Sequence, residues 1–172
     1  MSLEIILHDK TLKPSEKPGL LSQMLLENPL QMNELVILAA KGKDAEKGTC
    51  IEAMEHATLS IPALATAECF SLAVESLASA APRVKWESAR LIANIALLFR
   101  QRLPEAVPAL LTNSEHPGTV VRWSAATALA AIVKLKTPLN STLLPALQSL
   151  AEKEEKNSIR KIYLDGIKKA NK

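Results

Sequence analysis

Apolar residues along this chain recur every three or four positions, the spacing of one face of an α-helix. The clearest segment spans 117–135, and its apolar face consists of Val121, Ala125, Ala128, Leu129 and Ile132. A similar segment lies at 82–98, and in both a proline precedes a Val–basic–Trp triplet. Shorter helical patterns cover 20–27, 30–41, 44–58, 65–79, 103–111, 142–153 and 158–170. The pattern predicts about nine helices and no strand, so the expected fold class is all-α.

Residues 1–19 do not follow this pattern. A short apolar patch is followed by Pro14 and by Pro18, which interrupt regular structure. We therefore expect residues 1–19 to form an N-terminal arm, flexible or docked. The remaining residues, 20–172, are expected to form a single domain, because a chain of this length is sufficient for one core.

An internal repeat of 37 or 38 residues organises this domain. A basic residue recurs at that spacing, at Lys47, Lys85, Arg122 and Arg160. In the preceding helices, V-P-A-L at 107–110 aligns with L-P-A-L at 144–147. A two-helix unit cannot bury its apolar face alone, so such repeats stack into one continuous core. The predicted repeats span roughly 30–58, 62–100, 103–136 and 141–170.

These two motifs resemble the HEAT-repeat family. The first helix of that family carries V/L-P-A-L, and the second carries V-R-x-x-A-A-x-A-L, which stands here at 121–129. The resemblance covers about residues 30–170. It implies a right-handed α-solenoid of antiparallel helix pairs, an armadillo-type superhelix whose second helices line the concave side. Armadillo repeats, which have a third helix in each unit, are the alternative.

The turns between paired helices depart from the family pattern. The family commonly carries an Asp ahead of the basic position, and this Asp forms a ladder with the basic side chains across repeats. Neither 79–82 nor 114–117 contains an Asp. We therefore expect no ladder here, and we expect the basic side chains, Lys85 and Arg122 among them, to be free for binding.

Both tryptophans of the chain fall at one repeat position. If Val84 and Val121 point inward, residues two and six positions later point away from the core. Those residues are Trp86 and Arg90 in the second repeat, and Trp123 and Thr127 in the third. The equivalent residues are Gly48 and Glu52 in the first repeat, and Lys161 and Asp165 in the fourth.

Three interpretations of this face are open. In the first, each tryptophan packs over the neighbouring repeat with a cation on its ring. In the second, the rings and cations bind a protein, because aromatic and Arg residues dominate interface hot spots. In the third, they stack on nucleic-acid bases. This third interpretation is distantly similar to the HEAT-like alkylpurine DNA glycosylases, which carry Trp, Arg and Asp, but the only acidic residue in the two Trp-bearing helices is Glu87.

Composition and charge add to this picture. Hydrophobic residues make up 48% of the chain but aromatic residues only 3%, which suits closely packed helices. Residues 1–86 carry 8 basic and 11 acidic side chains, and residues 87–172 carry 13 and 7, so the halves have net charges of −3 and +6. This asymmetry indicates an acidic partner for the C-terminal half, or simply a solvated basic face.

The two cysteines and the lengths of the apolar runs indicate the cellular compartment of the protein. Cys50 and Cys69 form no CxxC motif and lie within apolar helical patterns, which favours a reduced, cytoplasmic protein with two buried thiols. No apolar run approaches the roughly 20 residues needed to span a bilayer, so we expect no membrane association.

Catalytic, metal and cofactor motifs are not found. His8, His56 and His116 are scattered without metal-ligand spacing, and neither cysteine has a nearby histidine. Glu52 and Glu55 share one helix with His56 and are expected on a solvated face.

The sequence therefore predicts a scaffold that binds a protein or peptide on its concave surface without catalysis or cofactor, with nucleic-acid binding as the alternative. Partner identity and oligomeric state stay open. The candidate binding residues are Trp86, Trp123, Lys85, Arg90, Arg122, Arg160 and Lys161.

Overall fold

A computed structural model describes residues 1–172, and all of its regular elements are helices. The α-helices are α1 (Leu3–His8), α2 (Lys17–Glu27), α3 (Met32–Lys41), α4 (Asp44–Ser60), α5 (Ala67–Ser76), α6 (Pro82–Ile95), α7 (Val107–Asn113), α8 (Thr119–Val133), α9 (Asn140–Lys153) and α10 (Asn157–Ala170). Three 3₁₀ helices connect them, namely η1 (Pro29–Gln31), η2 (Pro62–Leu64) and η3 (Ala96–Glu105). The all-α solenoid predicted from the sequence is confirmed.

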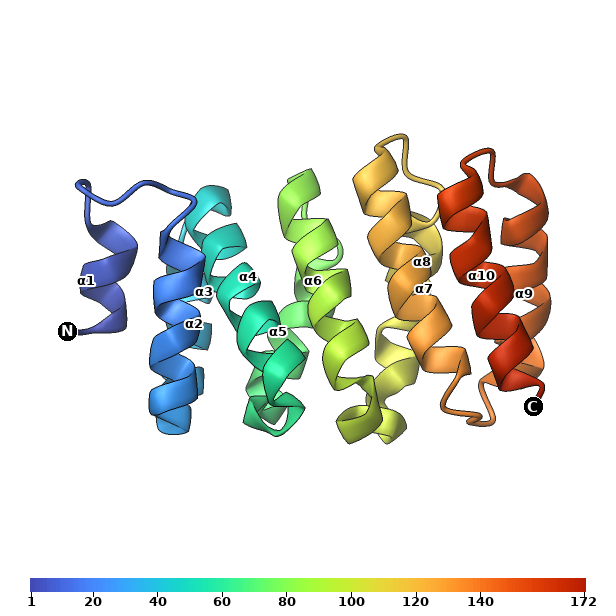
Figure 1. Ribbon diagram of the computed structural model, residues 1–172, viewed down its shortest axis with the longest axis horizontal. Helices are drawn as coiled ribbons and strands as arrows, with labels where there is room; N and C mark the ends of the chain where they lie inside the picture. Colours follow the sequence, from blue (N-terminus) through green and yellow to red (C-terminus); the bar gives the residue numbers. More distant parts are fainter.

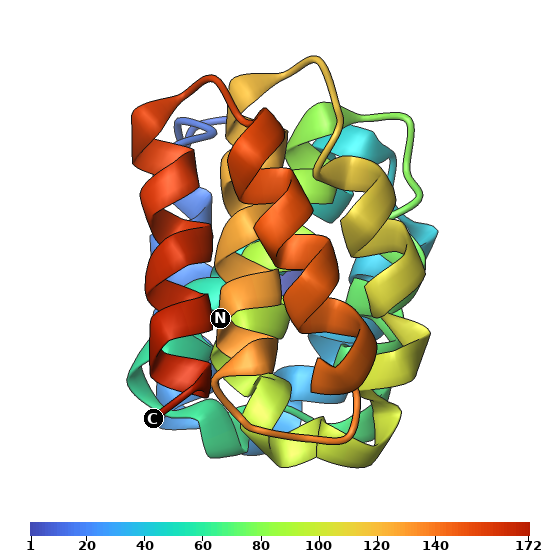
Figure 2. The same cartoon turned by 90° about the vertical axis from the view of Figure 1, so that its right-hand side faces the viewer.

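The helices form two layers along the long axis of the molecule (Figures 1 and 2). One layer stacks α2, α4, α6, α8 and α10 side by side, and the other contains α3, α5, α7 and α9. A single hydrophobic core runs between the layers, from Leu3 at one end to Tyr163 at the other. Each pair thus buries its apolar face against its neighbours, as a stacked repeat must.

Small residues allow the helices of the α2–α10 layer to approach closely. Ala125, Ala126 and Ala128 of α8 are fully buried. On α10, a Cβ added at Gly166 would lie 2.9 Å from the Cβ of Ala130, so only glycine fits at this crossing. The Ala-rich segment that dominates the sequence pattern is therefore the packing surface of one layer.

The turns lie at two opposite edges of the solenoid (Figure 1). The upper turns, at 42–43, 77–81, 114–118 and 154–156, connect each first helix to its paired second helix. The lower turns, at 28–31, 61–66, 96–106 and 134–139, connect one pair to the next. Proline begins η1, η2 and α6, where its missing N–H costs no helical hydrogen bond.

The N-terminal residues contain a helix that the sequence pattern did not predict. Ser2 caps α1, because its side-chain oxygen accepts a hydrogen bond from the Ile5 amide. Leu3, Ile6 and Leu7 are buried against the first repeats. A six-residue helix is too short to show helical periodicity in a sequence, which is why it was missed. None of the helices combines the length and the hydrophobicity that crossing a bilayer requires.

Candidate functional site on the α4–α6–α8 face

Three of the four basic side chains of the repeat are bonded within the chain, contrary to the expectation that they are free, and only that of Lys47 makes no hydrogen bond or ion pair. Lys85 donates to the Leu77 carbonyl and to Oδ1 of Asn113, each at 3.2 Å. Asn113 is itself buried and donates to the same Leu77 carbonyl. Lys85 thus connects the upper turn of its own repeat to the end of α7 in the next.

Arg122 makes the equivalent connection one repeat further on. Its Nε lies 3.1 Å from Oε2 of Glu154, and its guanidinium also donates to the carbonyls of His116 and Pro117. Arg160 donates to the Glu154 carbonyl. Burial acts to raise the pKa of Glu154, but hydrogen bonds from the Lys156 amide and Arg122 outweigh it and hold the pKa below its ordinary value.

A ladder across repeats therefore exists, with Asn113 and Glu154 as its acceptors instead of the family Asp. The sequence comparison missed both because they lie outside the turn positions where an Asp was sought. Lys85, Arg122 and Arg160 serve this ladder, and of the predicted cations Arg90 and Lys161 remain at the surface. Lys161 on α10 is exposed and makes no hydrogen bond or ion pair.

Both tryptophans lie on the outer face of the α2–α10 layer. Trp86 is half-buried, and its Nε1 donates to Oε1 of Glu87 at 3.0 Å. Trp123 is 37% exposed, and the Arg90 guanidinium lies 5.8 Å from the centre of its ring. The first interpretation, in which each tryptophan packs against a neighbouring repeat, therefore holds only in part, because both rings remain partly open to solvent.

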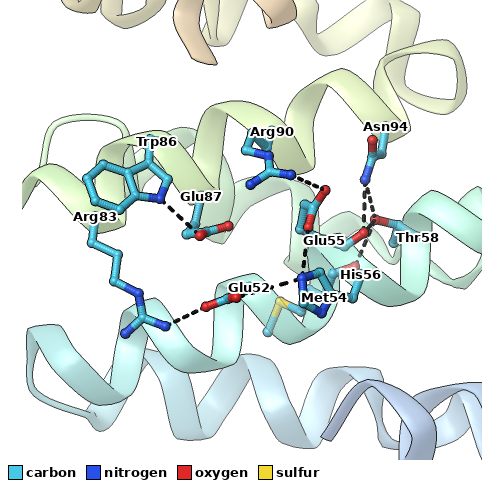
Figure 3. A network of polar contacts seen from close by, with 10 residues as sticks. All are labelled: Glu52, Met54, Glu55, His56, Thr58, Arg83, Trp86, Glu87, Arg90 and Asn94. Atoms are coloured by element: carbon cyan, nitrogen blue, oxygen red, sulfur yellow. Dashed lines mark hydrogen bonds and ion pairs between the residues drawn. The ribbon is translucent and has the colours of Figure 1, made fainter. Parts of the chain in front are cut away.

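The corresponding position on α4 is covered by an arginine of the next repeat. Gly48 is buried, and a Cβ added there would lie 3.3 Å from Cδ of Arg83. The Arg83 guanidinium is held by Glu52, with Nη2 and Oε2 2.5 Å apart (Figure 3). Gly48 is therefore not open to solvent, because the side chain of Arg83 occupies the space beside it.

Two buried carboxylates lie between these groups. Glu55 on α4 is 3% exposed and Glu87 on α6 is 4% exposed, so the expectation that Glu55 lies on a solvated face is wrong. Glu55 is 3.6 Å from both Arg90 and His56, beyond hydrogen-bond distance. Oε2 of Glu55 and Oε2 of Glu87 are buried and have no hydrogen-bond partner. Unpartnered buried oxygens are rare in folded proteins and require an explanation.

Glu52, Glu55 and Glu87 together form what we name the carboxylate cluster, which Figure 3 shows beside Arg83, Arg90 and His56. Burial raises the pKa of Glu87, and the nearby Glu52 and Glu55 add to the shift, against the hydrogen bond from Trp86 and the charge of Arg90. Three carboxylates thus face two guanidinium groups. The cluster therefore carries one more carboxylate than it has guanidinium groups, and its two unpartnered oxygens, on Glu55 and Glu87, are closed to solvent.

The sequence pattern does not indicate that Glu55 and Glu87 are buried. It singled out Trp86, Trp123 and Arg90 because they recur at one repeat position or carry an aromatic ring. Glu87 has no acidic equivalent in the other repeats, where Thr49, Ser124 and Ile162 stand. The sequence does show that Glu52 and Glu55 lie three positions apart on one helix and that Glu87 directly follows Trp86. It does not show that the side chains of Glu55 and Glu87 are buried.

Other chemistry-bearing groups lie away from this face. Burial raises the pKa of Cys50 and of Cys69 to about 12, so both thiols are protonated at neutral pH. A pocket of 360 Å³ beside Arg122 is lined by side chains of both charges, including Glu154, Lys153 and the buried Tyr163. No group of three or more His, Cys, Asp or Glu side chains is arranged to hold a metal ion.

No protein-family model and no curated protein sequence matches this chain. Solved structures do match it in fold. A designed armadillo repeat protein in complex with the peptide (KR)4 superposes with a TM-score of 0.76 at 17% identity, covering 98% of this chain and 80% of that one. An engineered protein gives a TM-score of 0.77 at 19% identity, covering 98% and 78%.

A natural assembly is also similar in fold. The complex of CpcE and CpcF of phycocyanin lyase from Nostoc sp. PCC7120 matches with a TM-score of 0.70 at 13% identity, covering 95% of this chain and 94% of that one. These neighbours establish an all-helical repeat solenoid of the HEAT and armadillo kind. At such identities the likeness concerns the fold alone.

Proposed function

We propose that this protein is a non-catalytic, cytoplasmic binding scaffold, and that an extended protein segment docks across α4, α6 and α8. The observation that carries the proposal is the juxtaposition of two incompletely covered tryptophans with buried carboxylates whose oxygens lack donors. Ring faces beside an excess of carboxylates suit a cationic side chain, which stacks on the rings and is attracted by the carboxylate charge, with the part-exposed Glu52 within its direct reach.

The partner segment is therefore expected to carry Arg or Lys. The partner's expected charge is thus opposite to the one suggested by the net charge of the C-terminal half, because Arg122 and Arg160 of that half are engaged in the ladder. Two neighbours support a protein partner, since one holds the peptide (KR)4 and another is a complex of two chains. Nucleic-acid binding ranks second, because it relies on Arg90 and Lys161 beside a surface with three carboxylates.

Intrinsic fluorescence offers a direct test, because both tryptophans of the chain lie on the proposed surface. An alternating Lys–Arg octapeptide, of the same sequence as the peptide held by the designed neighbour, should change the emission and bind more weakly as salt increases. An alternating Glu–Ser octapeptide and a single-stranded DNA oligonucleotide serve as controls. Binding of the DNA but not of the cationic peptide would contradict the proposal and support the second hypothesis.

The tryptophans themselves are tested by Trp86→Ala combined with Trp123→Ala, with a fluorescent label on the peptide in place of the lost emission. Because Trp123 is partly exposed and Trp86 half-buried, we expect peptide binding to be lost with a stability change far smaller than the roughly 3–5 kcal/mol of a core tryptophan. A stability loss of that full size with unchanged peptide affinity would show that the rings serve packing alone.

A further inference from the structure

A row of exposed aliphatic side chains follows the lower edge of the solenoid. Leu30 is 90% exposed, Leu59 is 66% exposed and Leu97 is 60% exposed. They occur at three successive lower turns or in the last turn of the helix before them. Large aliphatic residues scattered singly on a surface need no explanation, but a row at equivalent positions indicates an interface. We name this row the apolar edge; it consists of Leu30, Leu59, Ile61, Leu97 and Leu98.

Hydrogen bonds connect the lower turns, which carry the apolar edge, to one another in sequence. Thr66 donates to Oδ1 of Asn33, which ties the second lower turn to the start of α3. Arg102 donates to the Ala67 carbonyl, and Arg100 donates to the Leu135 carbonyl. Adjacent helices of a layer lie about 10 Å apart, so the exposed side chains follow one another at about that interval. Figure 1 shows the four turns along one side of the molecule.

Charge is ordered along the same edge. Its N-terminal part carries the exposed carboxylates of Glu27 at the end of α2, Glu34 at the start of α3 and Glu68 at the start of α5. Its C-terminal part carries exposed cations on η3, on the fourth lower turn and at the end of α10, namely Arg100, Lys136, Lys168 and Lys169. Glu105 on η3 is exposed as well but is paired with Arg102, so the net charge changes sign between the second and third lower turns.

We propose that two copies of this chain pair through the apolar edge, antiparallel, about a two-fold axis between the second and third lower turns. Such an axis brings Leu59 and Ile61 of one copy against Leu97 and Leu98 of the other. It also sets Glu68 opposite Arg100, and Glu34 opposite Lys136. An isologous interface of this kind makes every contact twice.

The order of charges along the apolar edge favours the antiparallel dimer over a parallel dimer and over binding to a bilayer. A parallel pairing sets the first lower turn against its own copy, so that Glu34 meets Glu34 and Lys136 meets Lys136. Like charges in contact disfavour that arrangement. An anionic bilayer attracts the C-terminal part of the edge but repels the N-terminal part, where Glu27, Glu34 and Glu68 alternate with the exposed leucines.

Analytical ultracentrifugation of the full chain tests the pairing. We expect a concentration-dependent species with twice the 18.6 kDa of one chain. Leu59→Ser combined with Leu97→Ser should weaken the dimer by roughly tenfold or more, because each substitution removes apolar contact twice. Leu164→Ser is the matched control, since Leu164 is 44% exposed but lies on α10 away from the edge, and it should leave the dimer unchanged.

Charge exchange tests the antiparallel order. Glu34→Lys with Glu68→Lys places cations opposite cations, and Arg100→Glu with Lys136→Glu places carboxylates opposite carboxylates, so each variant alone should be monomeric. An equimolar mixture should form a heterodimer, because all four contacts are then complementary. Helical content measured by circular dichroism confirms that each variant is folded.

Several outcomes would overturn the pairing. A wild-type chain that stays monomeric at every concentration excludes the dimer. A dimer that persists in the Leu59→Ser, Leu97→Ser variant lies on another surface, and a mixture of the charge variants that stays monomeric excludes the antiparallel order. A monomer that sediments with vesicles of phosphatidylcholine and phosphatidylserine, and loses this on the leucine substitutions, assigns the edge to a bilayer.

Discussion

The upper turns and the α4–α6 face both hold charged groups away from bulk water, but they satisfy these groups differently. At the upper turns, Arg122 bonds to Glu154 and to two carbonyls, so each partner is used. On the α4–α6 face, Glu55 and Glu87 each keep a buried oxygen without a donor. The recurring cations Lys85 and Arg122 connect adjacent repeats, whereas Glu55 and Glu87, which do not recur, keep unsatisfied oxygens.

Among the substitutions discussed below, Arg122→Ala should lower the stability of the fold the most. Glu154 is 7% exposed and Arg122→Ala removes its cation, so we expect the free energy of unfolding to fall by about 3 kcal/mol. Chemical denaturation measures this loss. Lys161→Ala removes a cation without a partner and should change stability by no more than about 0.5 kcal/mol. Equal effects of the two substitutions would contradict the ladder.

The contribution of the Arg122–Glu154 ion pair to stability should depend on pH. Because the folded-state pKa of Glu154 is lowered, its contribution is present above the pKa of the unfolded carboxyl and is lost as pH falls through the folded-state pKa. The stability difference between wild type and Arg122→Ala should therefore shrink in acid. A difference that stays constant across the carboxyl range would show that the carbonyl contacts of Arg122, and not its ion pair, supply the stability.

Lys85→Ala should cost less than Arg122→Ala. Lys85 bonds to a neutral carbonyl and a neutral amide, and its removal leaves Oδ1 of the buried Asn113 without a donor. We expect a loss of about 1–2 kcal/mol in the free energy of unfolding. Asn113→Ala should lower stability similarly, and the double variant should lose less than the sum of the two, because both side chains share one network.

Most of the fold was accessible from the sequence, because repeated apolar spacing and the small residues of 121–129 directly encode stacked helices. The environment of the candidate site could be predicted only in part. Trp86 and Trp123 were found because they recur, but the ladder acceptors Asn113 and Glu154 and the buried acid Glu87 were not. Their roles depend on which side chains of adjacent repeats meet in space, and one sequence carries no such information.

Glu87→Gln should have a smaller effect on stability than Lys85→Ala, and of the opposite sign. The folded-state pKa of Glu87 is raised by burial, so the wild-type protein loses stability as pH rises from the unfolded pKa through the folded one. A neutral amide avoids this loss and still accepts the hydrogen bond from Trp86. We expect thermal melts at neutral pH to show a higher melting temperature for the variant, and no difference in strong acid.

The central claim is that the carboxylate cluster binds a cationic protein segment, and one titration tests it most directly. Glu55→Gln with Glu87→Gln is compared with Glu75→Gln, which removes an exposed carboxylate on α5 in the other layer. We predict that the double variant binds the alternating Lys–Arg octapeptide about tenfold more weakly or worse, whereas Glu75→Gln binds it as the wild type does. Equal affinity of the wild type and the double variant would contradict the account.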